Sequence, residues 1–422
     1  MAGELTPRIG TSVMAAPATL AAALERANRR RRLKGLALAL PLALFLALFF
    51  IAPLVTMLVR SVYAPEVAAI MPRTVAALAD WDAATGLPGD AAYEALIADL
   101  IEASAQGTVN RVAGRLKYER AGMRALIVKT ARQVAAAPAG DARAMLAAID
   151  SQWETNAPWA ALAISGRPWS IAFYVQALDL RYDDTLAVVS EVEGQRIYVL
   201  LFVRTAWVSL TVTLLALVLG FPVAWLLAHA RPHVSDMLMV LVLLPFWTSI
   251  LVRTTAWIAL LQQQGVVNDM LVWAGVVADD GRLEMMYNMT GTLVAMTHVL
   301  LPFMILPLYS VMKTIPPTYV RAARSLGAGP VTAFVKIYLP LTLPGIGAGA
   351  ILVFILAAGY YITPTLVGGR TGQLISNQIA FHMQQSLNWG LAAAIGGLLL
   401  AAVILLYFIF QRAAGHDRLR FG

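Results

Sequence analysis

Long apolar runs recur along this chain, and they constrain its fold more than any other feature. A helical run of about 20 residues crosses the ~30 Å hydrocarbon core of a bilayer. Hydrophobic residues make up 59% of the 422 residues, and charged residues only 13%. Soluble domains hold about 25% charged residues. We therefore predict an all-α integral membrane protein that passes several times through a lipid bilayer.

Six of these runs are predicted to be transmembrane helices. The first occupies residues 35–60 and is too long for a cleaved signal peptide. The other five form a predicted core at residues 199–412. Their approximate ranges are 199–228, 237–261, 290–312, 346–362 and 390–410.

A segment of soluble composition, residues 61–198, separates the first apolar run from the second. Apolar residues at spacings of three and four predict helices over 91–103, 121–137 and 141–153. Turns are predicted at 156–158 and 166–168, which contain proline, and Asp183-Asp184 is a candidate start of a further element. We predict a mainly helical insert on the outer side of the membrane, which forms a small cap or subdomain. Its scattered acidic residues are interpreted either as a solvated surface or as a source of attraction for a cationic ligand.

The net charge of +8 is unevenly distributed along the sequence. The insert holds 12 Lys/Arg against 16 Asp/Glu, whereas the rest of the chain holds 20 against 8. Basic residues are retained in cytoplasmic loops. Arg29–Arg32 precede the first run, and Arg412, Arg418 and Arg420 follow the last. Both termini, residues 1–34 and 413–422, are therefore predicted to be cytoplasmic, and no nucleic-acid partner is expected.

The polar stretch 319–346, between the fourth and fifth runs, is predicted to form two short helices with a corner. Pro316-Pro317 suits a helix start, because the first helical turn has no use for the missing N–H. Gly327 falls where a left-handed C-terminal cap belongs. Pro330 fits the first turn of a second helix that runs to about Tyr338. Ala322 and Ala323 leave the first helix nearly bare, so that another protein can approach closely.

This second helix is predicted to end before the fifth run. Pro340 and Pro344 are expected to mark the entry into the fifth run. We expect Gly327 and Pro340 to set the corner angles of the loop.

A spaced pattern in this loop resembles a known family. Ala322-Ala323 is followed by three residues, Gly327, nine residues and then Ile337, Leu339 and Pro340. The pattern is similar to the coupling loop of ABC-importer permeases, Glu-Ala-Ala, three residues, Gly, nine residues, Ile, any residue, Leu-Pro. Arg321 stands where the family has Glu. The resemblance implies an ATPase-coupling loop at residues 313–343.

Other motifs resemble the polyamine branch of these permeases, which includes the spermidine/putrescine permease. They are Pro245-Phe-Trp-Thr-Ser, Val252-Arg253-Thr, Ala256-Trp257, Gly265, Asn268, Leu301-Pro302-Phe, Ile362-Thr-Pro364 and Gly368-Gly369. The insert is longer than the outer segment of that branch.

The resemblance implies the transmembrane subunit of an ATP-driven importer in a bacterial inner membrane. Its implied partners are two cytoplasmic ATP-binding subunits, a second permease subunit and a periplasmic solute-binding protein. The implied cargo is a polyamine such as spermidine or putrescine. The alternatives are another small solute, amino-acid-like or anionic, and a stand-alone secondary carrier.

The chain itself is not expected to be an enzyme, and no catalytic residue, metal site or cofactor is predicted. None of its five lysines follows a glycine, which excludes a Gly-Lys-Ser/Thr phosphate-binding loop. Cysteine is absent, which excludes thiolate sites. The six runs contain no carboxylate pair for a proton relay, and His298 is expected to be a hydrogen-bonded structural residue.

Five residues are candidates for the substrate path: Trp247, Arg253, Trp257, Tyr360 and Tyr361. Aromatic faces attract ammonium groups, which suits a polyamine. The alternative for the aromatic residues is a belt at the membrane interface. An arginine in an apolar run lies near the interface, lines a water-filled cavity or is paired, and Arg253 would oppose a cation if it faced the path.

Overall fold

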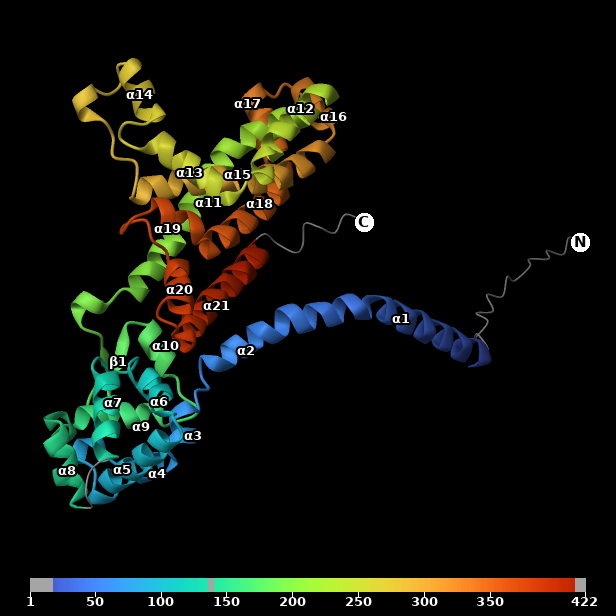
Figure 1. The fold of residues 1–422 in the computed structure, drawn as a ribbon. Helices are drawn as coiled ribbons and strands as arrows, with labels where there is room; N and C mark the ends of the chain where they lie inside the picture. The colour runs from blue at the N-terminus through green and yellow to red at the C-terminus, as the bar shows by residue number, and fades with distance from the viewer. Residues whose placement is uncertain (1–17, 136–139, 414–422) are drawn as a thin grey trace, which may run out of the picture. The chain divides into compact units, whose positions relative to one another are not determined.

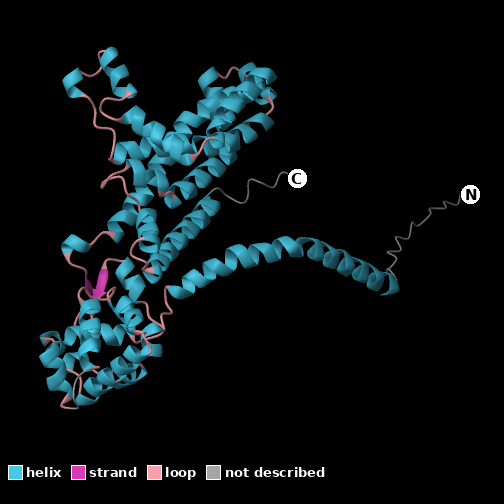
Figure 2. Ribbon diagram, viewed as in Figure 1, coloured by secondary structure: helices cyan, strands magenta, loops and turns pink. Residues whose placement is uncertain are grey.

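The computed structural model describes residues 18–135 and 140–413, so Arg418 and Arg420 of the predicted tail lie outside it. Helices make up nearly all of the described secondary structure, and the strands found there form one short antiparallel pair (Figure 2). The prediction of an all-α protein is confirmed. The chain divides into two units, residues 1–57 and 58–422.

The α-helices are labelled in Figure 1. They are α1 (Ala18–Leu46), α2 (Ala52–Arg60), α3 (Glu66–Ile70), α4 (Pro72–Ala77), α5 (Asp90–Ala105), α6 (Val109–Leu116), α7 (Met123–Val134), α8 (Ala142–Ile149), α9 (Asn156–Ser165), α10 (Ala172–Ala177), α11 (Tyr198–His229), α12 (Pro232–Leu243), α13 (Ile250–Leu261), α14 (Val266–Trp273), α15 (Met289–Thr314), α16 (Pro317–Ser325), α17 (Pro330–Ala333), α18 (Leu339–Gly359), α19 (Ile362–Val367), α20 (Ile375–Gln384) and α21 (Trp389–Ala413).

Short 3-10 helices, π-helices and two strands complete the described elements. The 3-10 helices are Ala83–Thr85, Ser151–Glu154, Glu193–Gln195, Leu244–Trp247 and Asp279–Gly281; the π-helices are Ala47–Ile51 and Phe334–Tyr338; the strands are β1 (Leu180–Tyr182) and β2 (Val188–Ser190).

In the first unit, a π-helical turn at Ala47–Ile51 joins α1 to α2 without a break. The stretch Lys34–Arg60 is long and apolar enough to cross a membrane. It contains Pro41, and membrane helices tolerate such a proline because local π adjustments and neighbouring groups satisfy the freed carbonyl.

In the second unit, α3 to α9 form a helical bundle with its own apolar core; residues 66–165 are called the bundle below. Trp153 and Trp159 are fully buried, with ring centroids 5.2 Å apart, and Tyr93 packs 4.6 Å from Trp159. The indole N–H of Trp153 donates to the hydroxyl of Thr130 at 3.0 Å. The one polar end of this ring is thereby satisfied inside the core.

The helix predicted over 91–103 is confirmed as α5. The helix predicted over 141–153 is interrupted, because α8 ends at Ile149, Asp150 is extended and a 3-10 turn follows it. The predicted helix 121–137 corresponds to α7, which ends at Val134. The turn predicted at 156–158 is wrong, because these residues form the first turn of α9. Proline fits there for the same reason as at Pro317: the first N–H groups of a helix have no partner within it.

The chain enters and leaves the bundle side by side. Tyr63 and Trp169 form an isolated β-bridge. The backbone amide of Ala64 donates to the carbonyl of Pro168 at 2.9 Å, and the backbone amide of Ser170 donates to the carbonyl of Val62 at 2.8 Å. After this point α10 packs against α21, and β1 and β2 form an antiparallel pair around the Asp183-Asp184 turn. The strand pair was not predicted.

The remaining chain has two apolar clusters, and the larger one lies between α11, α15 and α18, which pack side by side (Figure 1). Small residues allow these helices to approach closely. A Cβ on Gly220 would lie 3.3 Å from Met304, and one on Gly349 would lie 2.7 Å from the Met304 sulfur. Close approach through glycine is the usual way to pack helices in lipid, where burial of apolar surface gives little driving force.

The predicted third span, 237–261, is broken. Pro232–Trp247 and Ile250–Trp273 meet at 99° around an extended Thr248-Ser249 link. Ser249 starts the second piece by accepting the amide of Leu251 at 3.3 Å. The described chain therefore has five helices that could each cross a membrane, or six if the bent pair counts as one span.

Candidate functional site

The first helix of the predicted coupling loop is α16. Pro316 precedes its first turn, and Gly327 follows its last residues with a φ of +87°. The amide of Ala328 reaches back to the carbonyl of Ala323 at 3.0 Å, which closes the helix end. A side chain at Gly327 would strain this left-handed conformation, so the predicted glycine cap is confirmed.

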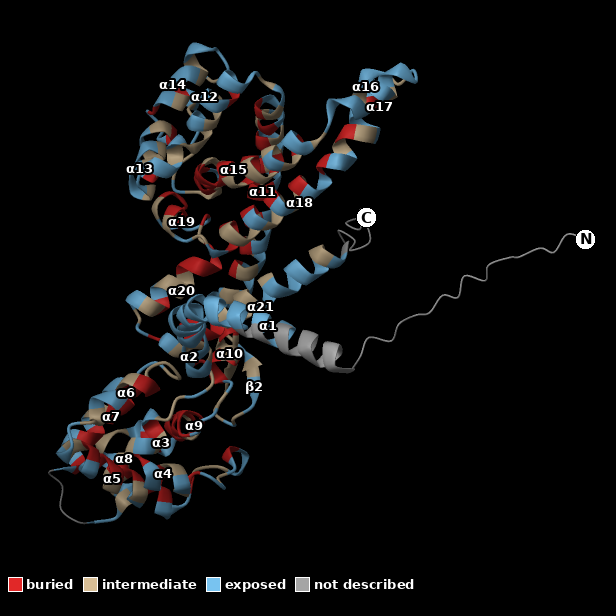
Figure 3. Cartoon of the chain, turned by 90° about the vertical axis from the view of Figure 1, so that its right-hand side faces the viewer, coloured by how far each residue is buried: buried red, intermediate tan, exposed pale blue. Residues whose placement is uncertain are grey.

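Most of α16 is open to solvent (Figure 3), and none of its residues is fully buried. Val320 is half-buried against the apolar core, and Ala323 is half-buried beside it. Arg321 and Ala322 are exposed, and Leu326, just after the helix, is 89% exposed. Of the two alanines predicted to leave this surface bare, Ala322 is exposed and Ala323 is half-buried.

The prediction that the second helix ends at a corner near Pro340 is wrong. Backbone helix is continuous over Pro330–Gly359, with a π-helical turn at Phe334–Tyr338. Pro340 lies in the first turn of α18, and Pro344 lies within that helix. The π turn shifts the hydrogen-bond register just before Pro340, so that the helix proceeds through both prolines. Ile337 and Leu339 are half-buried there, and Pro340 is exposed.

An aromatic cluster joins this π turn to the end of α11. The Phe334 and Tyr338 rings stack at 5.8 Å, and Phe334 also meets Phe221 edge-on at 6.0 Å. The His229 ring lies 5.6 Å from Tyr338 and stacks on Trp225 at 4.8 Å. We call these five residues the aromatic joint. It connects the coupling loop to α11 as well as to α18.

A polar contact joins two helices of the core, α13 and α15. The indole N–H of Trp257 donates to Nδ1 of His298 at 3.1 Å, as expected for a structural histidine. Arg253 lies one helical turn before Trp257 on α13, and Tyr360 follows the last residue of α18. The Nε of Arg253 is buried and has no hydrogen-bond partner among the described residues.

The other two path candidates are Trp247 and Tyr361. Trp247 is 90% exposed at the break of the third span. Tyr361 is also exposed, and its carbonyl accepts the Asn377 amide at 3.0 Å. Sequence reasoning missed Thr254 and Thr363, whose buried hydroxyls approach to 3.4 Å beside Arg253.

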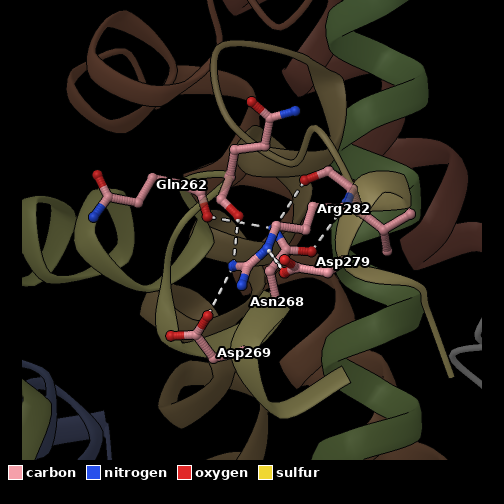
Figure 4. A network of polar contacts seen from close by, with 7 residues as sticks. Gln262, Asn268, Asp269, Asp279 and Arg282 are labelled. Atoms are coloured by element: carbon pink, nitrogen blue, oxygen red, sulfur yellow. Dashed lines mark hydrogen bonds and ion pairs between the residues drawn. The ribbon is translucent and has the colours of Figure 1, made fainter. Parts of the chain in front are cut away.

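The loop after α13 is held by a polar network (Figure 4). Arg282 binds Asp269 of α14 at 2.7 Å and Asp279 at 2.8 Å, and these two carboxylates raise the pKa of Arg282. The side chain of Asn268 accepts the amide of Leu283 at 2.9 Å. This network fixes α14 against the segment that follows it, and it gives Asn268, a residue of the family resemblance, a structural role.

A second set of polar contacts joins the bundle and the β-pair to the core. The Tyr118 hydroxyl donates to the carbonyl of Ser386 at 2.8 Å. His382 contacts the Ser386 hydroxyl at 2.8 Å through Nδ1 and the Tyr198 hydroxyl at 2.9 Å through Nε2. Next to them, the Asp179 carboxylate accepts three amides at the start of α11. We call these contacts the seam.

Neither the aromatic joint nor the seam was predicted from the sequence. The joint had a readable signal, because Trp225 and His229 are four residues apart in one helix, as are Phe334 and Tyr338. The seam had none, since Tyr118 and Ser386 are 268 residues apart.

Comparison with known proteins gives a family match for the second half of the chain. The profile of the family described as "Binding-protein-dependent transport system inner membrane component" matches residues 187–417. This range begins after the bundle and covers α11 to α21.

Proteins similar to this chain have names that describe transport systems. The spermidine/putrescine transport system permease protein PotB of Escherichia coli K12 is 35% identical over 206 residues, which cover 49% of this chain and 74% of that protein. The inner membrane ABC transporter permease protein YdcU of the same organism is 32% identical over 225 residues, 51% of this chain and 71% of that protein. A solved bacterial ABC transporter involved in alginate import is 20% identical, with a TM-score of 0.40, over 52% of this chain and 79% of that one.

Proposed function

Because this chain belongs to the family of inner membrane components of binding-protein-dependent transport systems, we propose that it is the permease of an ATP-driven polyamine importer. The proposal of a polyamine cargo rests on the 35% identity with the spermidine/putrescine permease over 206 residues. The proposed cargo is spermidine, putrescine or a similar linear polyamine.

In this proposal, the energy of ATP hydrolysis is transmitted to the permease through the coupling loop. Two cytoplasmic ATP-binding subunits bind the importer, and α16 lies in a groove of one of them, a helix-in-groove contact. The residues assigned to this role are Arg321, Ala322, Ala323, Gly327, Ile337, Leu339 and Pro340. Since the aromatic joint ties the π turn to α11, a movement of α16 reaches α11 as well as α15 and α18.

The solute path runs past Arg253, Trp257 and Tyr360, with Trp247 and Tyr361 nearer its ends. Aromatic faces attract ammonium groups by about 0.5–2 kcal/mol each. No Asp or Glu occurs between Met285 and His416, so α15, α18 and α21 offer a polyamine no strong ion pair. Weak binding favours passage, because a solute held tightly inside the membrane would not leave. A second permease subunit forms the other side of the path.

Orientation completes the proposal. Both termini and the coupling loop are cytoplasmic, and the bundle lies in the periplasm, where it docks or caps the solute-binding protein. The supporting observations are the charge distribution and the exposed α16 surface.

The test is ATP hydrolysis by the reconstituted complex of this chain, its second permease and its ATP-binding subunits. Binding protein loaded with spermidine or putrescine should stimulate hydrolysis several-fold over unloaded binding protein. Gly327→Val is the uncoupled control, because the φ of +87° at this position disfavours a side chain.

Two outcomes would contradict the proposal at different levels. Stimulation by binding protein loaded with an amino acid or an anion, and not with polyamines, would replace the cargo and make Arg253 a solute contact. Uptake into vesicles that lack any ATP-binding subunit would instead indicate a secondary carrier.

A further inference from the structure

The coupling helix carries only positive charge. Arg321 and Arg324 are exposed on α16, and no Asp or Glu occurs between Met285 and His416. Neither arginine forms an ion pair within the described residues. The one side-chain hydrogen bond that involves Arg321 there goes to its backbone carbonyl, from the Ser325 hydroxyl at 3.1 Å.

Two like charges three residues apart on a helix are neighbours, and their repulsion destabilises it. The α16 helix has nine residues, which is too short to be stable without help from its surroundings. Arg324, near the C-terminal end, is favoured by the helix dipole, whereas Arg321 lies in the middle and gains little from it. An external anion would remove this repulsion and bind both guanidinium groups.

We infer that α16 is a cationic docking surface whose partner is a carboxylate-bearing groove on the cytoplasmic ATP-binding subunit. This inference rests on the proposed function. A guanidinium presents donors in a fork that matches a carboxylate with two parallel hydrogen bonds. The groove would therefore carry Asp or Glu side chains opposite Arg321 and Arg324, in a charge arrangement set by this chain.

The surroundings of the two arginines favour a protein groove over lipid headgroups. A helix that lies on a membrane needs a free apolar face as well as basic residues. Val320 packs on the core and Ala323 is half-buried, so the free apolar surface of α16 is a narrow stripe of Tyr319, Ala322 and Leu326 rather than a broad face. Leu326, at 89% exposure, lies beside the charged face, and a groove wall over it would exclude water and strengthen the ion pairs.

The test measures binding of the purified ATP-binding subunit to the permease pair in lipid nanodiscs. The variants are Arg321→Glu/Arg324→Glu and the milder Arg321→Gln/Arg324→Gln, which keeps a long polar side chain. Arg231→Glu/Arg412→Glu is the matched control, because it makes the same change in charge at exposed positions outside the loop. Each is measured in neutral phosphatidylcholine and in discs with added anionic phosphatidylglycerol.

We expect the Glu variant to weaken binding about tenfold or more in both lipids, because it opposes carboxylates in a desolvated contact. The Gln variant should weaken binding less, and the control should bind like the wild type. Added salt should weaken wild-type binding and should have less effect on the Gln variant. An Asp→Arg or Glu→Arg change in the groove of the ATP-binding subunit should restore binding of the Glu variant.

Unchanged binding by the Glu variant would overturn the inference and leave the proposed function intact. A loss confined to anionic discs would overturn it in favour of lipid headgroups. If the wild-type chain binds no ATP-binding subunit at all, the proposed function fails first.

Discussion

At the scale of single residues, one buried carboxylate holds the start of α11. Asp179 accepts the amides of Ile197, Tyr198 and Val199 at 3.0, 2.9 and 2.8 Å. These are N–H groups that an α-helix leaves without partners at its first turn, and the negative charge also complements the helix dipole. Asp179 reaches them from a left-handed backbone conformation, with a φ of +57°. Aspartate adopts this conformation more readily than most residues do.

Removal of this cap should destabilise the protein. We expect Asp179→Ala to cost about 1–2 kcal/mol and to lower the melting temperature of the detergent-solubilised chain, followed by tryptophan fluorescence. Asp179→Asn should cost less, because one side-chain oxygen still accepts. Asp183→Ala is the control, since Asp183 binds only the exposed turn residues Thr185 and Ala187. Equal melting of Asp179→Ala and wild type would disprove the capping role.

His382 makes the seam sensitive to pH. Burial lowers the pKa of His382 below its usual value of 6.5, and both ring nitrogens are engaged, with Tyr198 and Ser386. A histidine that is neutral when folded opposes folding once it must be protonated. Its contribution to stability is complete above about pH 6.5 and is lost as the pH falls from there through the lowered pKa.

The melting temperature of the wild type should therefore fall between pH 7 and pH 5 by more than that of His382→Gln. The glutamine variant keeps hydrogen-bonding groups and cannot become charged in this range. The measurement is a melting series at fixed ionic strength. Parallel curves for the two proteins would show that His382 does not titrate in the seam.

At the scale of elements, the aromatic joint ties the π turn of the coupling loop to α11. Its strongest member is Tyr338, which is 4% exposed and contacts both Phe334 and His229. The Tyr338 hydroxyl is buried and has no hydrogen-bond partner among the described residues. The Tyr338 ring therefore contributes packing contacts, whereas its hydroxyl contributes no hydrogen bond within the described residues. The two groups can be tested separately.

Tyr338→Leu should remove the ring contacts, each worth about 0.5–1.5 kcal/mol, and loosen the link between α11 and the coupling loop. We expect basal ATP hydrolysis and binding of the ATP-binding subunit to persist, while the solute imported per ATP hydrolysed falls. Tyr338→Phe is the matched control and should behave like the wild type or be slightly more stable. A similar loss in both variants would argue against the joint.

Much of the fold was predictable because apolar composition alone defines a membrane helix. The predicted run 199–228 differs from α11, Tyr198–His229, by one residue at each end. The bend at Thr248-Ser249 was not predictable in this way, since both arms are apolar and the break depends on local backbone contacts. Proline misled the prediction at Pro158 and Pro340, because it is equally compatible with a turn and with a first helical turn.

The candidate site was predictable only in part. The spacing from Ala322 to Pro340 indicated a coupling loop, and the structure gives it an exposed helix and a glycine cap. The contact between Trp257 and His298 depends on the packing of α13 against α15, which no local pattern encodes.

At the scale of the whole molecule, the chain enters and leaves the bundle through two neighbouring segments. The Tyr63–Trp169 bridge brings its ends together, and the family match begins only at residue 187. Its apolar core is separate from the cluster that contains α10 and α21. Exposed, closely spaced ends are where domain insertions and deletions are tolerated.

Replacement of residues 66–166 by a short glycine-serine linker should therefore leave the spans assembled. We expect uptake and the affinity for the binding protein to fall, because the proposed docking surface is gone. Tyr118→Phe is the control: it keeps the bundle and removes only the hydrogen bond to Ser386. Unchanged uptake and unchanged affinity after the replacement would exclude a docking role for the bundle.

The separate core of the bundle also has a consequence for the order of synthesis. All of its core residues, from Val67 to Leu162, leave the ribosome before α11 does. The remaining chain takes roughly ten seconds or more to translate, whereas small helical domains fold within milliseconds. The bundle can thus be complete before α20 and α21 exist. The last helices made would then close the seam against a surface that is already folded.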